Sequence, residues 1–192
     1  GGLGNDEMQG EDGNDTITID QNNALPALVA QPNAQPGTLP DAEFHGGAGS
    51  DVLNGGAYAD QLFGDAGRDT LNGGGGADVL HGGAGNDMVA GEVGNDVLLG
   101  EAGRDTLAGG IGNDVYVWDG QDAVIEQANA GYDIVRTGSH MRMQANVEVA
   151  QVVGAAVTNI AGNELANTIS GNDAANQLSG GGGNGTLTGG GG

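Results

Sequence analysis

Aspartate recurs at every ninth residue over much of the 192-residue sequence, each time behind a glycine-rich stretch. From residue 46 to residue 117, eight consecutive nine-residue units share Gly at the first place and Asp at the sixth. The sixth residues are Asp51, Asp60, Asp69, Asp78, Asp87, Asp96, Asp105 and Asp114. Carboxylates at so regular a spacing are suited to binding hard dications, which take oxygen ligands.

The nine-residue period predicts one turn and one short strand per unit. Glycines in the first six residues allow the positive φ of a tight turn. The eighth residue is aliphatic in seven units and Tyr in the last, and in a strand it would point inward while its neighbours point outward. These inward residues are Leu53, Leu62, Leu71, Leu80, Val89, Leu98, Leu107 and Tyr116. Two units complete a coil, so the repeats predict an all-β roll of stacked parallel strands about 4.8 Å apart.

Stacking places the aspartates of alternate units above one another in two columns. One column holds Asp51, Asp69, Asp87 and Asp105, and the other holds Asp60, Asp78, Asp96 and Asp114. Carboxylates this close repel unless a cation lies between them. Ca²⁺ fits best, because it accepts six to eight oxygens including backbone carbonyls, whereas Mg²⁺ demands a strict octahedron and Zn²⁺ prefers His or Cys.

The composition supports a metal-dependent fold. The chain has 42 Gly, no Cys and a net charge of −22, with 26 acidic residues against four basic ones. Few large apolar side chains are available for an ordinary core, and disulfides are excluded. Nucleic acid is excluded as a partner because phosphate binding needs basic patches. No apolar run reaches the roughly 18 residues of a transmembrane helix.

The unit G-G-x-G-x-D-x-U-x resembles the nonapeptide of the RTX (repeats-in-toxin, haemolysin-type calcium-binding) proteins. The resemblance implies a fragment of a larger secreted bacterial protein and a right-handed parallel β-roll (β-helix). It also implies that Asp carboxylates and turn carbonyls of two turns one coil apart hold each Ca²⁺, with six ions in the core. The implied carbonyl ligands are Gly47, Gly49, Gly56, Gly67, Gly74, Gly76, Gly83, Gly85, Gly94, Gly103, Gly110 and Gly112.

Five segments are predicted: two N-terminal repeats at 1–18, an insertion loop at 19–45, the core calcium-binding roll at 46–117, a longer-strand capping region at 118–161 and degenerate repeats at 162–192. All four prolines fall in the insertion. If the insertion loops out cleanly, Asp6 stacks under Asp51 and Asp15 under Asp60, and the ions number eight. If it fills a coil, those two sites are lost. Either disorder or a contact with another subunit would explain the insertion.

The last repeats replace the acidic residue. Asn167 and Asn176 stand at the sixth place of two units, and Gly185 stands there in a third. Asn keeps an oxygen but not the charge, so these coils are expected to stack through amide hydrogen bonds with weak or no calcium binding.

Signatures of catalysis are missing from the sequence. It contains neither H-E-x-x-H nor G-x-S-x-G, and a P-loop is impossible without Lys. The three histidines, His45, His81 and His140, are scattered, which favours surface roles over a metal site. Arg68 and Arg104 occupy the fifth place of their units, where we expect them to offset negative charge at exposed turns. The chain is therefore not expected to be an enzyme in itself.

The leading functional hypothesis is a calcium-induced folding module of a secreted protein. Without Ca²⁺ an acidic, Gly-rich chain cannot offset its ordering entropy, and metal binding then supplies folding free energy. The resemblance implies type I secretion and an extracellular or cell-surface location. Two alternatives stay open: a structural or assembly segment of a surface layer or adhesin, with self-association or a cell-surface partner, and an accessory C-terminal domain of a secreted enzyme.

Overall fold

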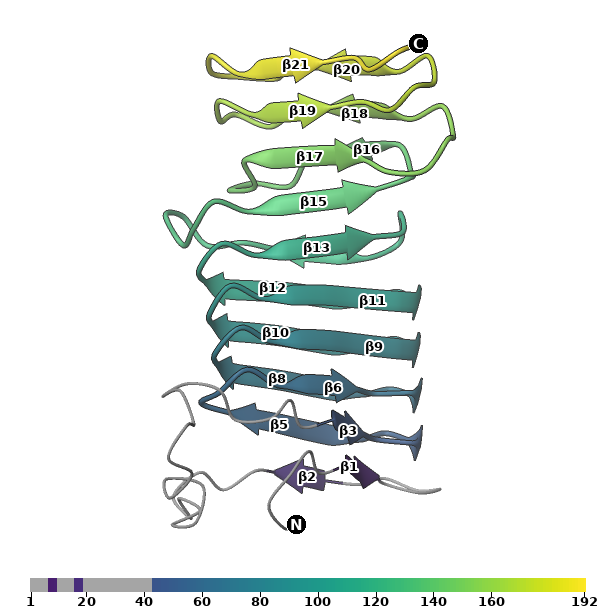
Figure 1. Ribbon diagram of the computed structural model, residues 1–192, viewed down its shortest axis with the longest axis vertical. Coiled ribbons are helices and arrows are strands. Elements are labelled where there is room, and N and C mark those ends of the chain that lie inside the picture. The colour runs from purple at the N-terminus through teal and green to yellow at the C-terminus, as the bar shows by residue number, and fades with distance from the viewer. Residues whose placement is uncertain (1–6, 10–15, 19–42) are drawn as a thin grey trace, which may run out of the picture.

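The computed structural model describes residues 7–9, 16–18 and 43–192, and these residues form 21 short strands and no helix. The strands wind into a single tall stack of coils, with the first strands at one end and the last at the other (Figure 1). No helix in the described part of the chain is therefore long and apolar enough to cross a membrane. The predicted all-β parallel roll is confirmed.

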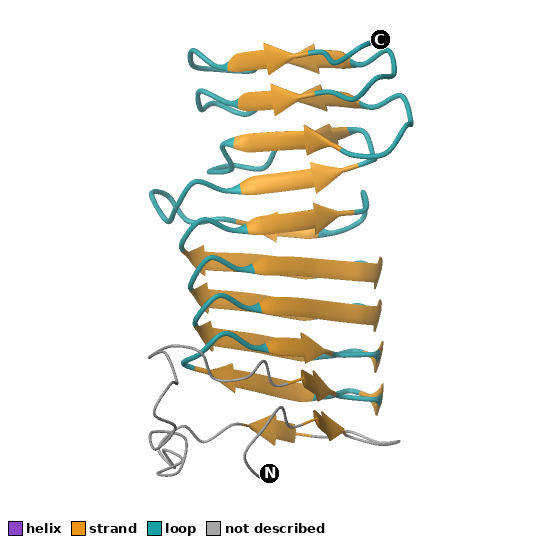
Figure 2. Ribbon diagram, viewed as in Figure 1, coloured by secondary structure: helices purple, strands orange, loops and turns teal. Residues whose placement is uncertain are grey.

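Three parallel sheets make up the walls of the stack, and loops and turns join the strands of one wall to those of the next (Figure 2). The 12-stranded sheet comprises β1 (Glu7–Gln9), β3 (Glu43–His45), β4 (Ala48–Gly49), β6 (Gln61–Phe63), β7 (Ala66–Gly67), β9 (Val79–Gly85), β11 (Val97–Gly103), β13 (Val115–Trp118), β15 (Ile134–Thr137), β17 (Val149–Val152), β19 (Thr168–Ser170) and β21 (Thr186–Thr188). The six-stranded sheet comprises β2 (Thr16–Thr18), β5 (Val52–Gly56), β8 (Thr70–Gly75), β10 (Met88–Val93), β12 (Thr106–Ile111) and β14 (Ala123–Ile125). The three-stranded sheet comprises β16 (Met141–Arg142), β18 (Asn159–Ala161) and β20 (Gln177–Ser179).

Strand pairing follows an 18-residue period through the eight repeats. Leu62 pairs with Leu80 and Leu80 with Leu98 in the large sheet, while Leu53 pairs with Leu71 in the six-stranded sheet. Two nine-residue units thus make one coil, as the sequence predicted. Each coil contributes one strand to each of two opposed walls.

The core is the narrow space between these walls. The eighth residue of every repeat from 46 to 117 is fully buried, with 0% of its surface exposed. Each such Leu stacks on its equivalent in the next coil, and burying one contributes about 2 kcal/mol. The inward ladder continues beyond the repeats through Val135, Ala150 and Ile169. This thin apolar column is the only hydrophobic interior that the described residues build.

The start of the roll differs in detail from the prediction. Strand β1 pairs with β3, and β2 pairs with β5. Residues 43–45, predicted as the end of the insertion, therefore form a strand of the stack, and Phe44 is buried in the core at 3% exposure. Asp6, Asp15 and residues 19–42 lie outside the described residues.

The segment from 118 to 161, predicted to be a cap of longer strands, lies inside the stack. Its strands are two to four residues long, and β17 pairs with β15 on one side and with β19 on the other. The degenerate repeats that follow continue the same walls (Figure 1). The regular coils and the degenerate coils are thus joined by irregular coils of the same architecture.

Candidate metal sites

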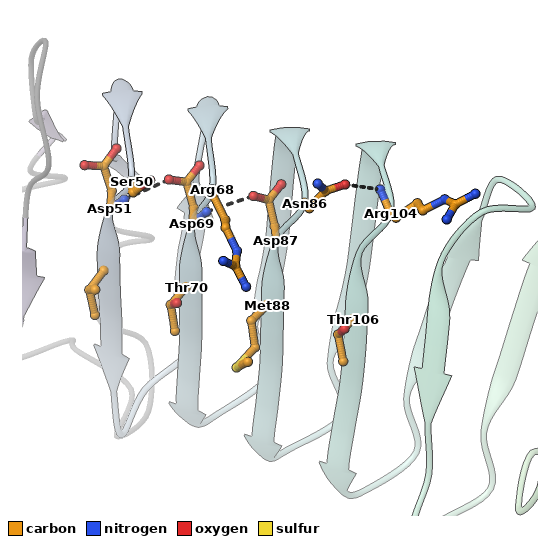
Figure 3. A pocket seen from close by; sticks show the side chains of 11 residues that line it. Ser50, Asp51, Arg68, Asp69, Thr70, Asn86, Asp87, Met88, Arg104 and Thr106 are labelled. Carbon is orange, nitrogen blue, oxygen red and sulfur yellow. Dashed lines mark hydrogen bonds between the residues drawn. The ribbon is translucent and has the colours of Figure 1, made fainter.

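Both predicted aspartate columns are present. In the first column, the backbone amides of Asp51, Asp69 and Asp87 each donate a 2.8 Å hydrogen bond to Oδ1 of the aspartate one coil further along. Figure 3 shows these carboxylates in line on successive strands. The amides of Asp60, Asp78 and Asp96 make the same 2.8 Å bonds in the second column. The turn that precedes each strand therefore holds the carboxylate in a fixed orientation between two coils.

In seven of these aspartates the second carboxylate oxygen has no such partner within the described structure. Oδ2 is buried without a hydrogen bond in the described structure in Asp60, Asp69, Asp78, Asp87, Asp96, Asp105 and Asp114. All of these residues are at most 6% exposed. Buried polar atoms in native proteins are almost always paired, because an unpaired one costs free energy. Two rows of buried, unpaired carboxylate oxygens are the donor set that a row of cations requires.

Burial disfavours the ionised form of aspartates in both columns and so raises their pKa values. Burial, with the charge of neighbouring carboxylates, raises the pKa of Asp60 and of Asp78 to about 7. The same effects raise the pKa of Asp87 to about 6. A dication beside each carboxylate would reverse this effect, since a nearby opposite charge favours the ionised form.

The first glycine of each unit lies directly beside the carboxylate of that unit, where a side chain would not fit. A Cβ on Gly46 would lie 2.8 Å from both Oδ2 of Asp51 and the carbonyl oxygen of Gly64, one coil further along. A Cβ on Gly82 would meet Oδ2 of Asp87 at 3.0 Å and the carbonyl of Gly100 at 2.8 Å. In five of the eight repeats, at Gly46, Gly55, Gly64, Gly82 and Gly91, a Cβ would meet both a carboxylate oxygen and a backbone carbonyl oxygen at 3.0 Å or less. Such an all-oxygen setting fits Ca²⁺.

The glycines predicted as carbonyl ligands occupy the second and fourth places of the turns. Most of them have positive φ, for example +97° at Gly47 and +149° at Gly49. The carbonyls of these two glycines accept hydrogen bonds from the amides of Ala66 and Arg68 in the next coil. Beside Gly46 and Gly82, the carbonyl next to the carboxylate belongs to the first-place glycine of the next coil.

Acidic residues at the second place tolerate positive φ and face outward. Asp65 has φ +67° and lies 3.0 Å from Nδ1 of His45, while Glu101, with the same φ, lies 2.7 Å from Nδ1 of His81. The rings of His45 and His81 stack on opposite faces of Phe63, with centroids 4.6 Å apart in each pair. These histidines form an outer aromatic ladder across three coils.

A surface hollow lies above the first column and includes Arg68 and Arg104 in its lining (Figure 3). We expected these arginines to offset the charge of the turns. Within the described residues, the ion pairs within 4.0 Å involve only His45 and His81. Any effect of the two guanidinium groups on the charge of the turns is therefore exerted over more than 4.0 Å.

Two aspartates outside the predicted set extend the columns. The amide of Asp105 donates to Oδ1 of Asp122 at 3.1 Å, and the amide of Asp114 donates to Oδ1 of Asp133 at 2.9 Å. Oδ2 of Asp122 and of Asp133 is buried and unpaired like those of the regular columns. The spacings are 17 and 19 residues instead of 18, so a search for a constant period misses them.

The asparagines of the degenerate repeats bond to backbone groups, although Nδ2 of Asn176 is buried without a partner in the described structure. Oδ1 of Asn167 accepts the amide of Asn163 at 2.8 Å, and its Nδ2 donates to the carbonyl of Val147 at 3.0 Å. Oδ1 of Asn176 accepts the amide of Asn172 at 2.9 Å. The side chain of Asn167 bonds to the preceding coil, as the sequence led us to expect, whereas the bond of Asn176 lies within its own turn.

A calcium-binding parallel β-solenoid is the class of protein that these features define. Comparison with protein families matches the RTX calcium-binding nonapeptide repeat to residues 1–20, 45–80, 81–116 and 161–192. These four matches cover more than half of the chain, so the chain belongs to this family. No match was found among curated proteins or among solved structures.

Proposed function

We propose that this chain is a calcium-induced folding module of a secreted protein and that it is not catalytic in itself. The observation that carries the proposal is the pair of columns of buried carboxylates, in which Asp69, Asp78, Asp87, Asp96, Asp105 and Asp114 each have Oδ1 bonded to the preceding coil and Oδ2 unpaired within the described structure. Folding without a cation buries these charges at a cost, and a cation between neighbours converts the cost into attraction.

Six intervals between neighbouring aspartates lie within the eight repeats, three in each column. We propose one Ca²⁺ in each. The carboxylates on both sides and the carbonyls of first-place glycines would supply the oxygens. The apolar core is only one column of side chains wide, so it contributes little stability. The bound ions would supply the remaining stability.

Secretion is a further part of the proposal, which the RTX repeat family suggests and a calcium-dependent fold would suit. Affinities of extracellular calcium modules lie around 10⁻⁴–10⁻³ M. A chain with such sites stays unfolded where Ca²⁺ is scarce, can pass a secretion channel, and folds outside the cell. Type I export and an extracellular or cell-surface location are therefore part of the proposal. The non-catalytic assignment rests on the absence of the protease and lipase motifs from the sequence.

A role in assembly is the second candidate, because apolar side chains lie exposed at the ends of two neighbouring strands. Val93 and Ile111 pair in register on β10 and β12 and are 54% and 63% exposed. Such a strip on neighbouring coils could contact another subunit of a surface layer. Calcium-dependent polymerisation, measured by light scattering, would favour this role over a monomeric folding module.

The decisive experiment is far-UV circular dichroism during a Ca²⁺ titration, with Mg²⁺ as the control ion and the fluorescence of Trp118 as a second probe. We expect a cooperative coil-to-β transition at sub-millimolar to millimolar Ca²⁺. Mg²⁺ at the same concentrations should leave the chain unfolded. A full β signal in excess chelator at neutral pH would contradict the proposal.

A further inference from the structure

The second aspartate column ends in a cluster of three carboxylates. Asp114, Glu126 and Asp133 each place one oxygen within 4.8 Å of the others, and all three are buried. Asp114 is the sixth residue of the last regular repeat. Asp133 belongs to the turn before β15, and Glu126 directly follows β14. Glu126 has no counterpart in the regular intervals, where each neighbouring pair contributes two carboxylates.

Glu126 is held in this cluster by its own hydrogen bonds. One carboxylate oxygen accepts the phenol proton of Tyr116, and the other accepts the amide of Gln127 at 3.1 Å. Its side chain is folded into the stack, and the residue is 8% exposed. Repulsion from the neighbouring carboxylates would by itself favour a side chain that extends into solvent. The fixed inward position of Glu126 therefore indicates a role in the interior.

The position of Tyr116 explains how the cluster is assembled. In the preceding coil, a Cβ on Gly91 would meet the carbonyl of Gly109 at 2.7 Å. At Gly109 itself a Cβ would meet the hydroxyl of Tyr116 at 2.5 Å, and the register of β12 with β14 places Glu126 where the next first-place glycine would stand. The phenol oxygen accepts the amide of Gly109 at 2.6 Å and donates its proton to Glu126, which lies beside the two aspartates.

Two oxygens in the cluster have no partner. Oδ2 of Asp114 and Oδ2 of Asp133 are buried without a hydrogen bond in the described structure, and the residues are 0% and 1% exposed. None of the ion pairs among the described residues reaches the cluster. Three buried carboxylates within 4.8 Å of one another, two of them with an unpaired oxygen, are a set of ligands that suits a cation.

We propose that Asp114, Glu126 and Asp133 bind a Ca²⁺ ion in a site distinct from the regular turn sites. Three carboxylates give this site one more negative charge than a regular interval, and ligand charge is one of the factors that set calcium affinity. The site is the tightest in the chain and marks the junction between the regular and the irregular coils. Ca²⁺ fits the carboxylate set, which has none of the His or Cys ligands that Zn²⁺ prefers.

Isothermal titration calorimetry of the full chain with Ca²⁺ tests the proposal through Glu126→Gln. The amide keeps the size of the side chain and an oxygen for Tyr116, and it removes one charge. Glu164→Gln is the matched control, because Glu164 is an exposed glutamate in a degenerate coil. We expect the tightest site to weaken at least tenfold in Glu126→Gln and to be unchanged in Glu164→Gln. Identical isotherms for the parent chain and Glu126→Gln would overturn the proposal.

Crystals of the parent chain grown with Ca²⁺ and soaked with Tb³⁺ decide the question even if Glu126→Gln does not fold. An anomalous peak at coordination distance from Asp114, Glu126 and Asp133 is the expected result. Ions in the regular intervals with none at the cluster would overturn this inference and leave the proposed function intact. A chain that binds no Ca²⁺ at all would overturn both, because the inference rests on the calcium-bound fold proposed above.

Discussion

The backbone amide of Asp78 donates a 2.8 Å hydrogen bond to Oδ1 of Asp96, while Oδ2 of Asp96 is buried and unpaired within the described structure. A single carboxylate thus joins two coils with one oxygen and presents the other to the space between them. The same arrangement recurs along both columns, so folding and cation binding depend on the same side chains.

Asp96→Asn tests the role of charge in the column. Asp96 borders two intervals, toward Asp78 and toward Asp114. The amide oxygen can still accept the bond from Asp78, but the negative charge is lost and an NH₂ group replaces an oxygen. We expect the Ca²⁺ concentration at half-folding, measured by circular dichroism, to rise about tenfold because ligand charge sets affinity. Asp173→Asn, at an exposed position, is the control. Equal midpoints for Asp96→Asn and the parent chain would contradict a metal role for this column.

The pH dependence of the metal-free chain follows from the raised pKa values of the columns. Burial raises the pKa of Asp60 and of Asp78 to about 7, so the folded state binds more protons than the unfolded state. This stabilisation is complete below the ordinary aspartate pKa of about 3.9 and is lost as the pH rises through about 7. In calcium-free buffer, circular dichroism should show more β structure at pH 4 than at pH 8.

Calcium should reverse this dependence. Because the ligands must lose their protons, the apparent Ca²⁺ affinity is expected to increase from pH 5 to pH 8. Titrations at several pH values would measure it. An affinity that is independent of pH would show that the buried carboxylates are not the ligands.

Gly67→Ala tests the close approach of neighbouring turns. Gly67 has φ +153°, and a Cβ there would overlap the carbonyl oxygen of Gly49 in the preceding coil. Gly75→Ala is a matched control, because its nearest neighbour would be Cα of Ala57 at 3.6 Å, an ordinary contact. We expect Gly67→Ala to lower the free energy of unfolding in saturating Ca²⁺ by about 1–3 kcal/mol or more, measured in urea. Similar stabilities for the two variants would refute the packing argument.

Asn167→Asp tests whether the degenerate coils are independent of calcium. Asn167 is fully buried, and its Nδ2 donates to the carbonyl of Val147. Aspartate removes this donor and buries a charge, so we expect a loss of roughly 1–3 kcal/mol in unfolding free energy. Excess Ca²⁺ should not restore it. Asn184→Asp, at an exposed position, should change little. Recovery of Asn167→Asp by Ca²⁺ would mean that these coils retain a metal site.

The sequence by itself determined the regular part of this protein. A strict nine-residue period specifies which side chains point inward, and the eighth residues from Leu53 to Tyr116 are all buried as that period requires. The period also specifies which aspartates stack, and the bond from Asp51 to Asp69 follows it. Each coil contacts only its neighbours, so local spacing is enough to define the contacts.

Only the tertiary structure decided where the period breaks. Asp122 and Asp133 join the columns across spacings of 17 and 19 residues, and Glu126 enters the interior from a position that carries no repeat signal. Phe44 enters the core from a segment predicted as an insertion. The stack requires each coil to meet the one below it in space, and turns of different lengths can satisfy that requirement. Contacts between coils, which a spacing rule does not contain, therefore fix these residues.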